Sequence, residues 1–418
     1  MTESAVPLNE VKPVPQGWRW VRLGEVCEIN RPRPNGFTRF ADAPTTFVPM
    51  AAVDEKLGAI SKSEIRPYSQ VSIGYTYFEE GDVLFAKITP CMQNGKHVIA
   101  RNLIDGIGFG TTEFHVLRPK GESLPEWIHF FIRQPYFLRE AVTYFTGAVG
   151  QQRVPESFLA NYRIPLPPLP EQKRIAAKVQ ELMGDVERAR TACEAQLEAA
   201  KALPRAYFRQ VFESEKARKW ERRRLGEIVS LLKNGIVAEQ NSEGHGFKVT
   251  RIETISNRLI DPEKVGYINL PVQHFEDFKL EPGDILFSHI NSVERLGNCA
   301  IYEGIPRELY HGMNLLCIRG NKDILDPYFL LFWLRGDECK KYYAICARRA
   351  IGQASLNQTD LRHIPVPLSP LASQQRIATE LQDRIASAEK LKVAIEKQLD
   401  AIKALPQAIL RKAFSGEL

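Results

Sequence analysis

The sequence predicts an α+β fold built from two copies of one unit, each a globular α/β domain followed by a long helix. An internal repeat with a shift of 202 residues, β-rich runs separated by Gly/Pro/Asn turns, and regularly spaced apolar residues support this prediction. At 418 residues the chain is also longer than one ordinary core needs. We expect the two long helices to pair antiparallel as a coiled coil, with pseudo-two-fold symmetry between the copies.

The repeat is visible in motifs that recur at a constant shift. "W-x3-RLGE" begins at Trp18 and again at Trp220, and "EEGDVLF" at 79–85 returns as "EPGDILF" at 281–287. Near the end of each copy, 17 of 39 aligned positions are identical, including "KALP". Self-similarity of this length indicates a duplicated structural unit.

The first part of each copy is predicted to be globular, over residues 1–163 and 215–363. Runs such as "GDVLFAKI", "EFHVLRP", "GDILFSHI" and "NLLCIRG" have the composition of strands. "LPEWIHFFIRQPYFLREAV" and "DPYFLLFWLRGDECKKYY" have the pattern of helices that begin after a proline.

The second part of each copy, residues 164–214 and 364–418, is predicted to be helical. It opens on "IPLPPLPEQKRIA" or "IPVPLSPLASQQRIA". Each proline fixes φ and removes a donor, so the prolines stop the preceding fold before the Gln/Arg/Ala-rich helix begins.

Apolar residues in both helical parts are spaced alternately by four and three residues, which is typical of a coiled-coil seam. A helix of ~30 to 40 residues spans roughly 45 to 60 Å, which is longer than one small domain needs. Two amphipathic helices packed separately on their own domains are the alternative. The positions expected to pair the helices or bind subunits, including two glutamines that interrupt the series, are Ile175, Val179, Leu182, Val186, Gln196, Leu203, Ile377, Leu381, Leu391, Ile395, Gln398, Ile402 and Leu405.

Composition and charge bear on the partners of the protein and on the compartment in which it is found. The net charge of +6 fits a nucleic-acid partner and equally fits many cytosolic enzymes. Seven cysteines without a C-x-x-C pair do not fit a disulfide framework and favour a reducing compartment. The most hydrophobic run, "YFLLFWL" at 328–334, is too short to cross a bilayer, so we expect a cytoplasmic protein without a membrane partner.

Catalytic signatures are missing from the sequence. It contains no G-x-x-x-x-G-K-[ST], no H-E-x-x-H, no G-x-S-x-G and no Asn/Asp-Pro-Pro-Tyr/Phe motif. "IDGIGFG" at 104–110 precedes a predicted strand, whereas a phosphate-binding glycine loop precedes a helix. His97, His115 and His129 are scattered and are more typical of core or surface positions than of ligands. We therefore expect no catalytic residue, metal or cofactor on this chain.

Polar residues differ between the copies at equivalent places, while the surrounding frame is retained. "GDVLF" continues into "AKITPCMQNGK", and "GDILF" into "SHINSVERLGN". Such side chains can read base edges in a DNA groove, and arginines before the later "GQ" can contact phosphates; ordinary turn residues are the alternative at each position. The candidate DNA-binding residues are Lys87, Thr89, Gln93, Asn94, Lys96, Arg153, His289, Asn291, Ser292, Arg295, Arg348 and Arg349.

The basic run "EKARKWERRR" at 215–224 offers a further place for phosphate contacts. A solvated linker between the two copies is an equally good interpretation of it.

Together these motifs resemble the specificity subunit of type I restriction-modification systems. The resemblance rests on "GWRWVRLGEV", "LPPLPEQKRIAAKV" and the 202-residue duplication, and it covers essentially the whole chain. The second junction departs from the pattern with "SPLASQQ" in place of "PPLPEQK", which leaves the start of the second helix open.

The resemblance implies two target-recognition domains that each read one half of a bipartite double-stranded DNA site. The helices would set the spacing, about one to two turns of B-DNA, and bind two modification (methyltransferase) subunits, which restriction (translocase and nuclease) subunits join. S-adenosylmethionine, ATP and Mg would then be bound by the partner subunits. A stand-alone nuclease or methyltransferase with an unrecognised active site and a protein-only coiled-coil adaptor are the alternatives.

Overall fold

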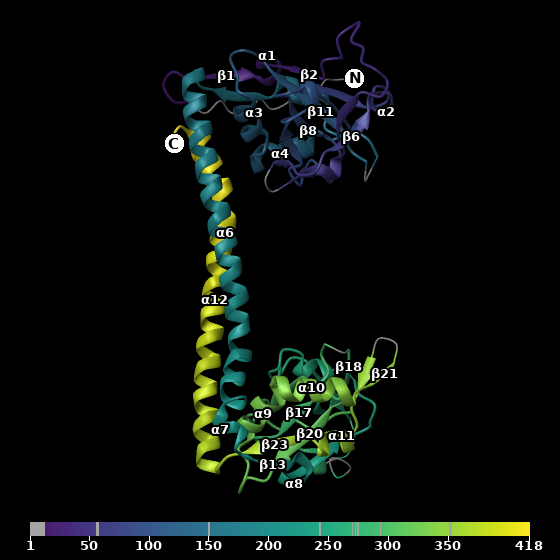
Figure 1. Ribbon diagram of the computed structural model, residues 1–418, viewed down its shortest axis with the longest axis vertical. Helices are drawn as coiled ribbons and strands as arrows, with labels where there is room; N and C mark the ends of the chain where they lie inside the picture. Colours follow the sequence, from purple (N-terminus) through teal and green to yellow (C-terminus); the bar gives the residue numbers. More distant parts are fainter. Residues whose placement is uncertain are drawn as a thin grey trace. The chain divides into compact units, whose positions relative to one another are not determined.

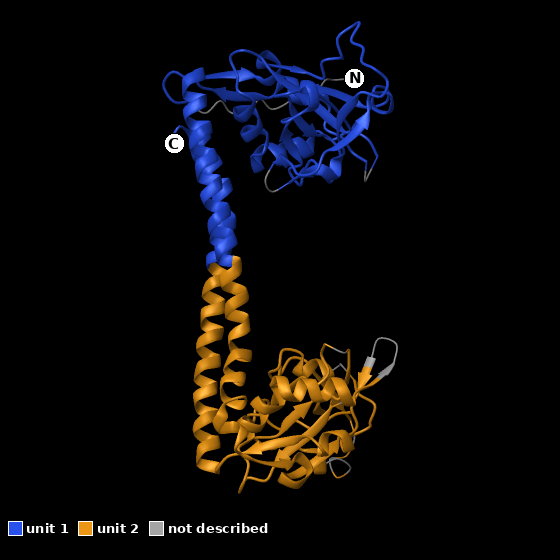
Figure 2. Ribbon diagram, in the orientation of Figure 1, with its two compact units in different colours: residues 1–193, 398–418 blue, residues 194–397 orange. Residues whose placement is uncertain are grey.

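The computed structural model divides the chain into two compact units, shown in Figure 2. Unit 1 is Met1–Cys193 with Gln398–Leu418, and unit 2 is Glu194–Lys397. The structure describes residues 13–55, 58–148, 151–241, 244–269, 271, 273, 276–292, 294–313, 315–350 and 353–418, without the side chains of Arg349, Ala350 and Gln353. Each unit contains one α/β domain and a part of both long helices (Figure 1).

The central sheet of unit 1 has four antiparallel strands in the order β2-β11-β8-β9. Two helices that begin at prolines pack their apolar faces on it, in one cluster with residues of both long helices. Proline suits this position because the first helical N–H groups have no partner within the helix. The bounds are β2 (Cys27–Ile29), β8 (Val83–Ala86), β9 (His97–Ile99), β11 (Phe114–Pro119), α3 (Pro125–Ile132) and α4 (Pro135–Thr143).

The central sheet of unit 2 repeats this arrangement in the order β14-β20-β17-β19. The 202-residue shift carries each strand and helix of the unit 1 frame onto its counterpart here, so the duplication predicted from the sequence is confirmed. The bounds are β14 (Val229–Asn234), β17 (Ile285–Phe287), β19 (Cys299–Ile301), β20 (Leu316–Gly320), α9 (Pro327–Arg335) and α10 (Asp337–Cys346).

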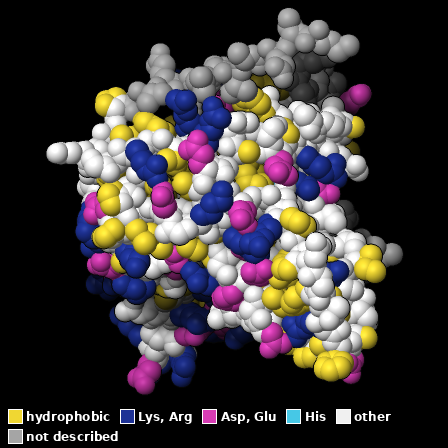
Figure 3. Space-filling view, turned by 90° about the horizontal axis from the view of Figure 1, so that it is seen from above, with side chains coloured by type: hydrophobic (Ala, Val, Ile, Leu, Met, Phe, Trp, Pro, Cys, Tyr) yellow, Lys and Arg dark blue, Asp and Glu magenta, His cyan; other side chains and the backbone are white. Residues whose placement is uncertain are grey.

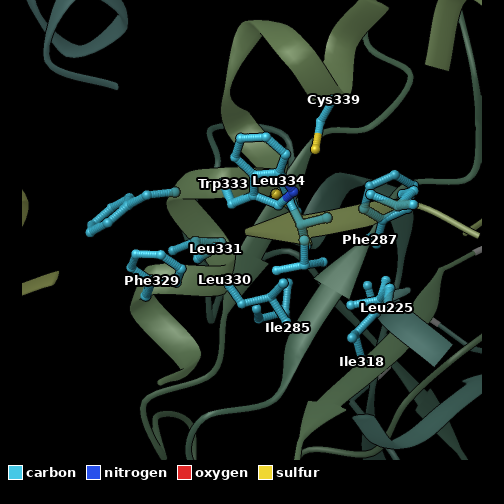
Figure 4. Close-up of a cluster of buried hydrophobic side chains, with 14 of the residues drawn as sticks. Leu225, Ile285, Phe287, Ile318, Phe329, Leu330, Leu331, Trp333, Leu334 and Cys339 are labelled. Carbon is cyan, nitrogen blue, oxygen red and sulfur yellow. The ribbon is translucent and has the colours of Figure 1, made fainter. Parts of the chain in front are cut away.

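The apolar run at 328–334 forms α9, and its residues Phe329–Leu334 are all buried in the core of unit 2. Figure 4 shows Leu330, Leu334 and Trp333 beside strand residues of the sheet. In the described part of the chain no helix is long and apolar enough to span a membrane.

Each unit adds its own strands to the common frame. Unit 1 has a second four-stranded sheet, β6-β3-β10-β7, in which β3 and β10 are parallel, and a β4-β5 hairpin. Unit 2 has the β15-β16 pair and the three-stranded sheet β18-β22-β21. The bounds are β3 (Pro44–Val48), β4 (Val53–Asp54), β5 (Ala59–Ile60), β6 (Glu64–Pro67), β7 (Thr76–Glu79), β10 (Ile107–Gly110), β15 (Phe247–Thr250), β16 (Val265–Ile268), β18 (Ile290–Asn291), β21 (Arg348–Ala350) and β22 (Gln353–Ser355).

The "IDGIGFG" motif contributes its glycines to packing in β10. A Cβ on Gly108 would lie 2.4 Å from the Phe78 ring, and one on Gly110 would lie 2.8 Å from the Val48 carbonyl oxygen. These glycines therefore allow the neighbouring strands and the ring to approach closely, which explains the motif without a phosphate ligand.

The "GD" of each "GD-[VI]-LF" motif fixes the turn that leads into the central strand. Asp82 is buried and accepts hydrogen bonds from Arg118 Nε at 2.8 Å and from the Glu79 backbone N–H at 2.7 Å. Asp284 is held in the same way by Arg319, with 2.7 Å between Nε and Oδ1. A buried carboxylate satisfied by a guanidinium and a backbone donor is a stable anchor, so both motifs hold the same frame.

The proline junction forms an edge strand before the helix. β12 (Arg163–Leu166) pairs antiparallel with β1 (Arg19–Arg22), which carries Trp20 of the opening motif, and β23 (Pro365–Leu368) pairs in the same way with β13 (Glu221–Arg224). Prolines are tolerated at an edge because they leave no ladder bond unmade in the interior. The first and last strands of each globular domain are thus paired directly before the long helix begins.

Short helices complete the two domains, several of them at matching places in the two copies. They are α1 (Leu23–Val26), α2 (Tyr68–Val71), α5 (Glu156–Asn161), α7 (Glu215–Arg218), α8 (Leu225–Ile228), α11 (Gln358–Arg362), and the 3-10 turns η1 (Met50–Ala52), η2 (Ile104–Gly106), η3 (Ile252–Ile255) and η5 (Glu276–Phe278).

A buried glutamine locks each junction to its domain. Gln172 donates from Nε2 to the Pro167 and Glu122 carbonyl oxygens, both at 2.8 Å, and accepts from the Leu124 N–H at 2.9 Å. Gln374 makes the equivalent three bonds to Ser369, Ile324 and Asp326 at 2.8, 2.9 and 3.0 Å. Both side chains are almost fully buried, at 0% and 1% exposed.

The long helices α6 (Leu169–Phe212) and α12 (Leu371–Ser415) pair antiparallel within each unit. In unit 1 the beginning of α6 shares an apolar cluster with the end of α12, and Arg174 donates to the Leu418 carbonyl oxygen at 2.5 Å. In unit 2 the end of α6 packs on the beginning of α12, and the Arg384 guanidinium lies 5.6 Å from the Tyr207 ring centre. The antiparallel pairing predicted from the sequence is confirmed. The second helix starts at Leu371.

Four of the thirteen predicted positions are exposed, and at each of them the next residue along the helix is buried or partly buried. Leu391, Gln398 and Leu405 are exposed on α12, whereas Leu399 is buried and Lys392 and Pro406 are partly buried. Likewise on α6 Gln196 is exposed and Leu197 is partly buried. The remaining predicted seam positions are buried or partly buried, namely Ile175, Val179, Leu182, Val186, Leu203, Ile377, Leu381, Ile395 and Ile402.

The error has a simple physical origin. The predicted series counted from Ile377 and alternated four and three residues, whereas the buried series starts at the small residue Ala378 and alternates three and four. In that phase Ile385 and Leu399 occupy the positions that the prediction assigned to polar residues, so the glutamines do not interrupt the seam. Positions at i, i+3 and i+4 share a face, which allowed both phases to fit the apolar pattern.

The junction glutamine generates a stability prediction. Gln374→Ala leaves the partly buried Asp326 N–H and two carbonyl groups without their partner, so it should lower the free energy of unfolding by about 2 to 4 kcal/mol. Gln375→Ala, at the exposed neighbour, should change it by less than about 0.5 kcal/mol. Urea denaturation followed by circular dichroism measures both, and equal effects would contradict the proposed lock.

The corrected seam generates a second prediction. Leu399→Ala removes a buried side chain and should destabilise the chain by about 2 kcal/mol, the low end of the range for buried leucines because a helix pair relaxes more easily than a core. Leu391 is 48% exposed, so Leu391→Ala should have an effect below about 0.5 kcal/mol. If Leu391→Ala lowered the free energy of unfolding more than Leu399→Ala in the same denaturation assay, the seam predicted from the sequence would be correct and the corrected seam wrong.

Candidate nucleic-acid interface

In unit 1 the fold brings the two candidate segments together. Ile88, which follows β8, forms a β-bridge with Arg153, and Arg153 also bridges Thr146. Backbone hydrogen bonds continue the contact, from the Thr89 N–H to the Gln152 carbonyl oxygen at 3.0 Å and from the Val154 N–H to the Lys87 carbonyl oxygen at 2.9 Å. The loop after "GDVLF" and the loop around "GQ" therefore form one surface.

Unit 2 brings its two candidate segments together in the same way. β18 and β21 both pair with β22, so that Ile290 and Arg348 each lie opposite Ser355. The Leu356 N–H donates to the His289 carbonyl oxygen at 2.8 Å. These bridges correspond to those of unit 1 under the 202-residue shift, so the same frame presents different residues in the two units.

Lys87 lines a cavity of about 360 Å³ in unit 1. Arg31 and Arg33 also line it, together with the rings of Tyr75 and Tyr77. Arginine and lysine can hold a phosphate, and aromatic faces can stack on a base, so the cavity has the chemistry of a nucleic-acid contact. These two arginines are not among the residues predicted from the sequence, although "NRPRPNG" at 30–36 places each of them directly before a proline.

Two cations of unit 1 that were predicted to bind DNA form hydrogen bonds within the domain. Arg153 forms a two-pronged ion pair with Glu113, with 2.8 Å between Nε and Oε2 and 2.7 Å between Nη2 and Oε1. Lys96 donates to the Val53 carbonyl oxygen at 2.9 Å. Both side chains are partly exposed, so the prediction that they contact DNA stays open, and in the isolated chain each also holds its own domain together. Lys96 ties its loop to β4.

The tip of the unit 1 loop is polar and accessible. Gln93 and Asn94 are exposed, and the loop is closed by the hydrogen bond from the Asn94 N–H to the Pro90 carbonyl oxygen at 3.0 Å. Thr89 is partly buried, and its hydroxyl oxygen is buried without a hydrogen-bond partner in the described structure. Gln93 and Asn94 therefore remain the most accessible candidates for base contacts in this unit.

In unit 2 the candidate loop is held by its own side chains. Asn291 donates from Nδ2 to Ser288 Oγ at 3.0 Å and accepts from the Ser292 N–H at 2.9 Å. His289 is buried, and its Nδ1 has no hydrogen-bond partner in the described structure. Burial lowers the pKa of His289, so the ring is neutral at neutral pH and can donate or accept.

The arginines of unit 2 lie at the edge of this surface. Arg295 and Arg348 are exposed, whereas the side chain of Arg349 lies outside the part of the chain that the structure describes. Exposed guanidinium groups beside a polar loop are suited to phosphate contacts.

The basic run at 215–224 does not form a solvated linker. It folds into α7 and β13, and Arg222 pairs with Glu338, with 2.6 Å between Nη1 and Oε1. Arg223 lies 3.7 Å from Glu227. Arg222 and Arg223 therefore help to hold the start of the second domain in place.

Charge is mixed on the face shown in Figure 3. Lys and Arg side chains are interspersed with Asp and Glu there and do not gather into one basic patch. This agrees with the small net charge of +6. Electrostatic attraction to DNA from this face is correspondingly modest.

The three histidines of unit 1 are packed in its core. His115 Nε2 lies 2.9 Å from the Val154 carbonyl oxygen, and burial lowers its pKa. Burial lowers the pKa of His129 to about 3 and that of His97 well below its usual value, with Arg133 adding to both shifts. Among the described residues no group of three His, Cys, Asp or Glu side chains could hold a metal ion.

Two homologous α/β domains with unlike loops, each carried on an antiparallel helix pair, define a duplicated two-domain protein. The chain belongs to the family of the type I restriction modification DNA specificity domain, whose family model matches residues 15–197 and 217–401. The resemblance stated from the sequence is thereby confirmed.

Curated relatives carry the same description. The type I restriction enzyme EcoEI specificity subunit of Escherichia coli is 40% identical over 171 residues, which cover 41% of this chain and 28% of the relative. The EcoKI specificity subunit of Escherichia coli strain K12 is 26% identical over 316 residues, covering 72% of this chain and 68% of the relative. The chain spans less than half of the length of three curated relatives that it matches. The aligned parts cover 45%, 28% and 30% of these relatives.

Solved structures agree over the full length. The HsdS subunit from Thermoanaerobacter tengcongensis superposes with a TM-score of 0.70 at 26% identity, covering 98% of this chain and 99% of that one. A chain described under "complex assembly and conformational transition of the type I R-M system" gives a TM-score of 0.76 at 26% identity, covering 97% and 100%. The two-domain fold with paired long helices is therefore shared with specificity subunits.

The Arg153–Glu113 pair generates a pH prediction. Its hydrogen bond and charge hold the pKa of Glu113 below the ordinary value of 4.5. The unfolded chain then binds more protons below pH 4.5, so the pair stabilises the fold above that pH and this stabilisation is lost as the pH falls through the lowered pKa. Glu113→Gln should make the stability of the chain less dependent on pH in this acidic range.

The measurement is the urea midpoint of unfolding as a function of pH. Arg153→Gln should flatten the acid limb in the same way, and the double variant should add nothing further. Profiles that stay parallel to that of the unchanged chain would contradict the role of the pair.

Proposed function

We propose that this chain is a sequence-specific DNA-binding subunit of a type I restriction-modification complex. Each globular domain reads one half of a bipartite site on double-stranded DNA. The single observation that carries this proposal is the meeting of the same two loops, with different residues, at equivalent places in both units.

A constant frame with variable contents is suited to reading two unlike sequences. The frame consists of matching central sheets, anchored by Asp82 and Asp284. The contents are side chains such as Gln93 and Asn94 in one domain and His289 and Arg295 in the other, all of types that can bond base edges. The two half-sites should therefore differ in sequence.

The paired helices act as the spacer and the docking surface. Their antiparallel pairing within each unit supports the role of a spacer. Leu391, Val393 and Leu405 on α12 are between 41% and 48% exposed. We assign the exposed face of the helices, which includes these side chains, to contacts with two modification (methyltransferase) subunits, which restriction subunits join.

Catalysis in such a complex belongs to the partner subunits. S-adenosylmethionine, ATP and Mg are bound there, and this chain contributes recognition and assembly. Its small net charge supports an affinity for DNA that is shared with basic surfaces of the partners, so that the isolated chain binds DNA weakly. Such a complex acts on DNA in the cytoplasm.

Mapping methylated adenines tests the assignment of the loops. In a host that carries the complete system, His289→Ala should change or weaken recognition in one half-site, and Gln93→Ala in the other half-site. Loss of one good base contact costs about 1 to 3 kcal/mol, or roughly 5- to 150-fold in preference at that position.

Lys173→Gln, an exposed change on α6, is the control and should leave both half-sites intact. A variant of one domain that altered both half-sites, or neither variant altering any, would contradict the proposal.

A further inference from the structure

Unit 2 contains a second cavity beside its candidate reading loop. It has a volume of about 180 Å³ and lies between the loop residues Glu294 and Leu296–Cys299 and one face of α10. Gly297 is essential to this arrangement, because at φ +79° a Cβ would lie 2.5 Å from the Tyr343 ring. The loop backbone thus packs directly on the helix and forms one wall of the cavity.

Three cations line this cavity, namely Arg258, Arg335 and Lys340. Within the described part of the chain none of them forms an ion pair within 4.0 Å. Glu294 at the cavity is the only acidic residue among its lining residues. Asp337, the other acid close to Lys340, is already bound by Arg205 and Arg209 at 2.7 and 2.6 Å.

The Arg335 side chain is held by hydrogen bonds at Nη2 but has none at Nε. Its Nη2 donates to the carbonyl oxygens of Arg258 and Cys299 at 2.6 and 2.8 Å. Its Nε is buried and has no hydrogen-bond partner in the described structure. Buried donors are nearly always bonded, so Arg335 is left with less than its usual set of acceptors, and the neighbouring Cys299 side chain only partly offsets the effect of burial on its pKa.

Burial and the repulsion between neighbouring positive charges affect the pKa values of these cations. Burial and then the charge of Arg258 lower the pKa of Lys340, and burial lowers the pKa of Arg335. An anion in the cavity would offset this cost, because each cation would gain an opposite charge.

The equivalent arginine of unit 1 has a different environment. Arg133 matches Arg335 under the 202-residue shift, but it donates to the Glu55 carbonyl oxygen at 2.9 Å. Burial lowers the pKa of Arg133, and the nearby charge of Asp54 opposes that shift. Gly58 of the β4-β5 hairpin packs against Arg133. A hairpin with an acid covers the arginine in unit 1, whereas Arg258 adds a second cation in unit 2.

We propose that Arg258, Arg335 and Lys340 form a phosphate-binding site in unit 2. Guanidinium forks and an ammonium group match phosphate oxygens, and the cavity is wide enough for one phosphate group. The loop that lines it also carries Arg295 of the candidate reading surface. The phosphate is therefore either a backbone phosphate of DNA or a free phosphate anion, and the site stands independently of the proposed function.

The test is calorimetric titration of inorganic phosphate into the full chain at constant ionic strength. The unchanged chain should bind phosphate saturably, and Lys340→Gln should weaken binding about tenfold, the loss of one charge-assisted hydrogen bond at an accessible position. Arg258→Asn should have a similar effect, because asparagine tolerates the left-handed backbone at φ +62°. Circular dichroism confirms that both variants are folded.

Lys341→Gln is the matched control, an exposed lysine on the same helix that does not line the cavity. It should leave phosphate affinity unchanged within twofold. Absence of saturable binding to the unchanged chain, or an equal loss in Lys341→Gln, would overturn the proposal.

Binding of the assembled complex to DNA distinguishes the two sources. If a backbone phosphate occupies the site, Lys340→Gln should weaken binding to all DNA sequences alike and reduce the salt dependence by about one ion. If only the free anion binds there, Lys340→Gln should reduce phosphate affinity and leave the salt dependence on DNA unchanged. Either result supports the phosphate site and identifies its source.

Discussion

The hydrogen bonds of one buried glutamine in each copy hold the architecture together. Gln172 and Gln374 each connect the first turn of a long helix to the junction strand and to the loop before a domain helix, with three bonds of 2.8 to 3.0 Å. Because these groups are buried, breaking the contact leaves backbone donors and acceptors unsatisfied. Each domain is thus oriented on its helix by a polar contact that tolerates little variation in angle.

This rigidity allows the variable loops to be selective. A base-reading side chain is selective only if its position is fixed to within a fraction of a hydrogen-bond length. The buried aspartates of the "GD" motifs and the paired edge strands supply that precision in both units. The loops can then differ freely, as they do between "AKITPCMQNGK" and "SHINSVERLGN", without disturbing the frame.

The two units use the same frame for different electrostatics. In unit 1 Arg153 pairs with Glu113 and Arg31 pairs with Glu28, and Arg31, Arg33 and Lys87 line one cavity. In unit 2 the cations Arg258, Arg335 and Lys340 surround the other. The +6 net charge of the chain gives no indication of these local groups of cations.

The sequence by itself determined the duplication, the α/β character of each half, the two long helices and the family, because repeats and apolar periodicity are local patterns. It also located the loops that meet in each unit. Only the tertiary structure decided the phase of the seam, where Ala378 rather than Ile377 begins the buried series, since two phases share most of a helix face. It also decided which cations remain free: pairs such as Arg153 with Glu113 join residues 40 positions apart, and only folding brings them within hydrogen-bond distance.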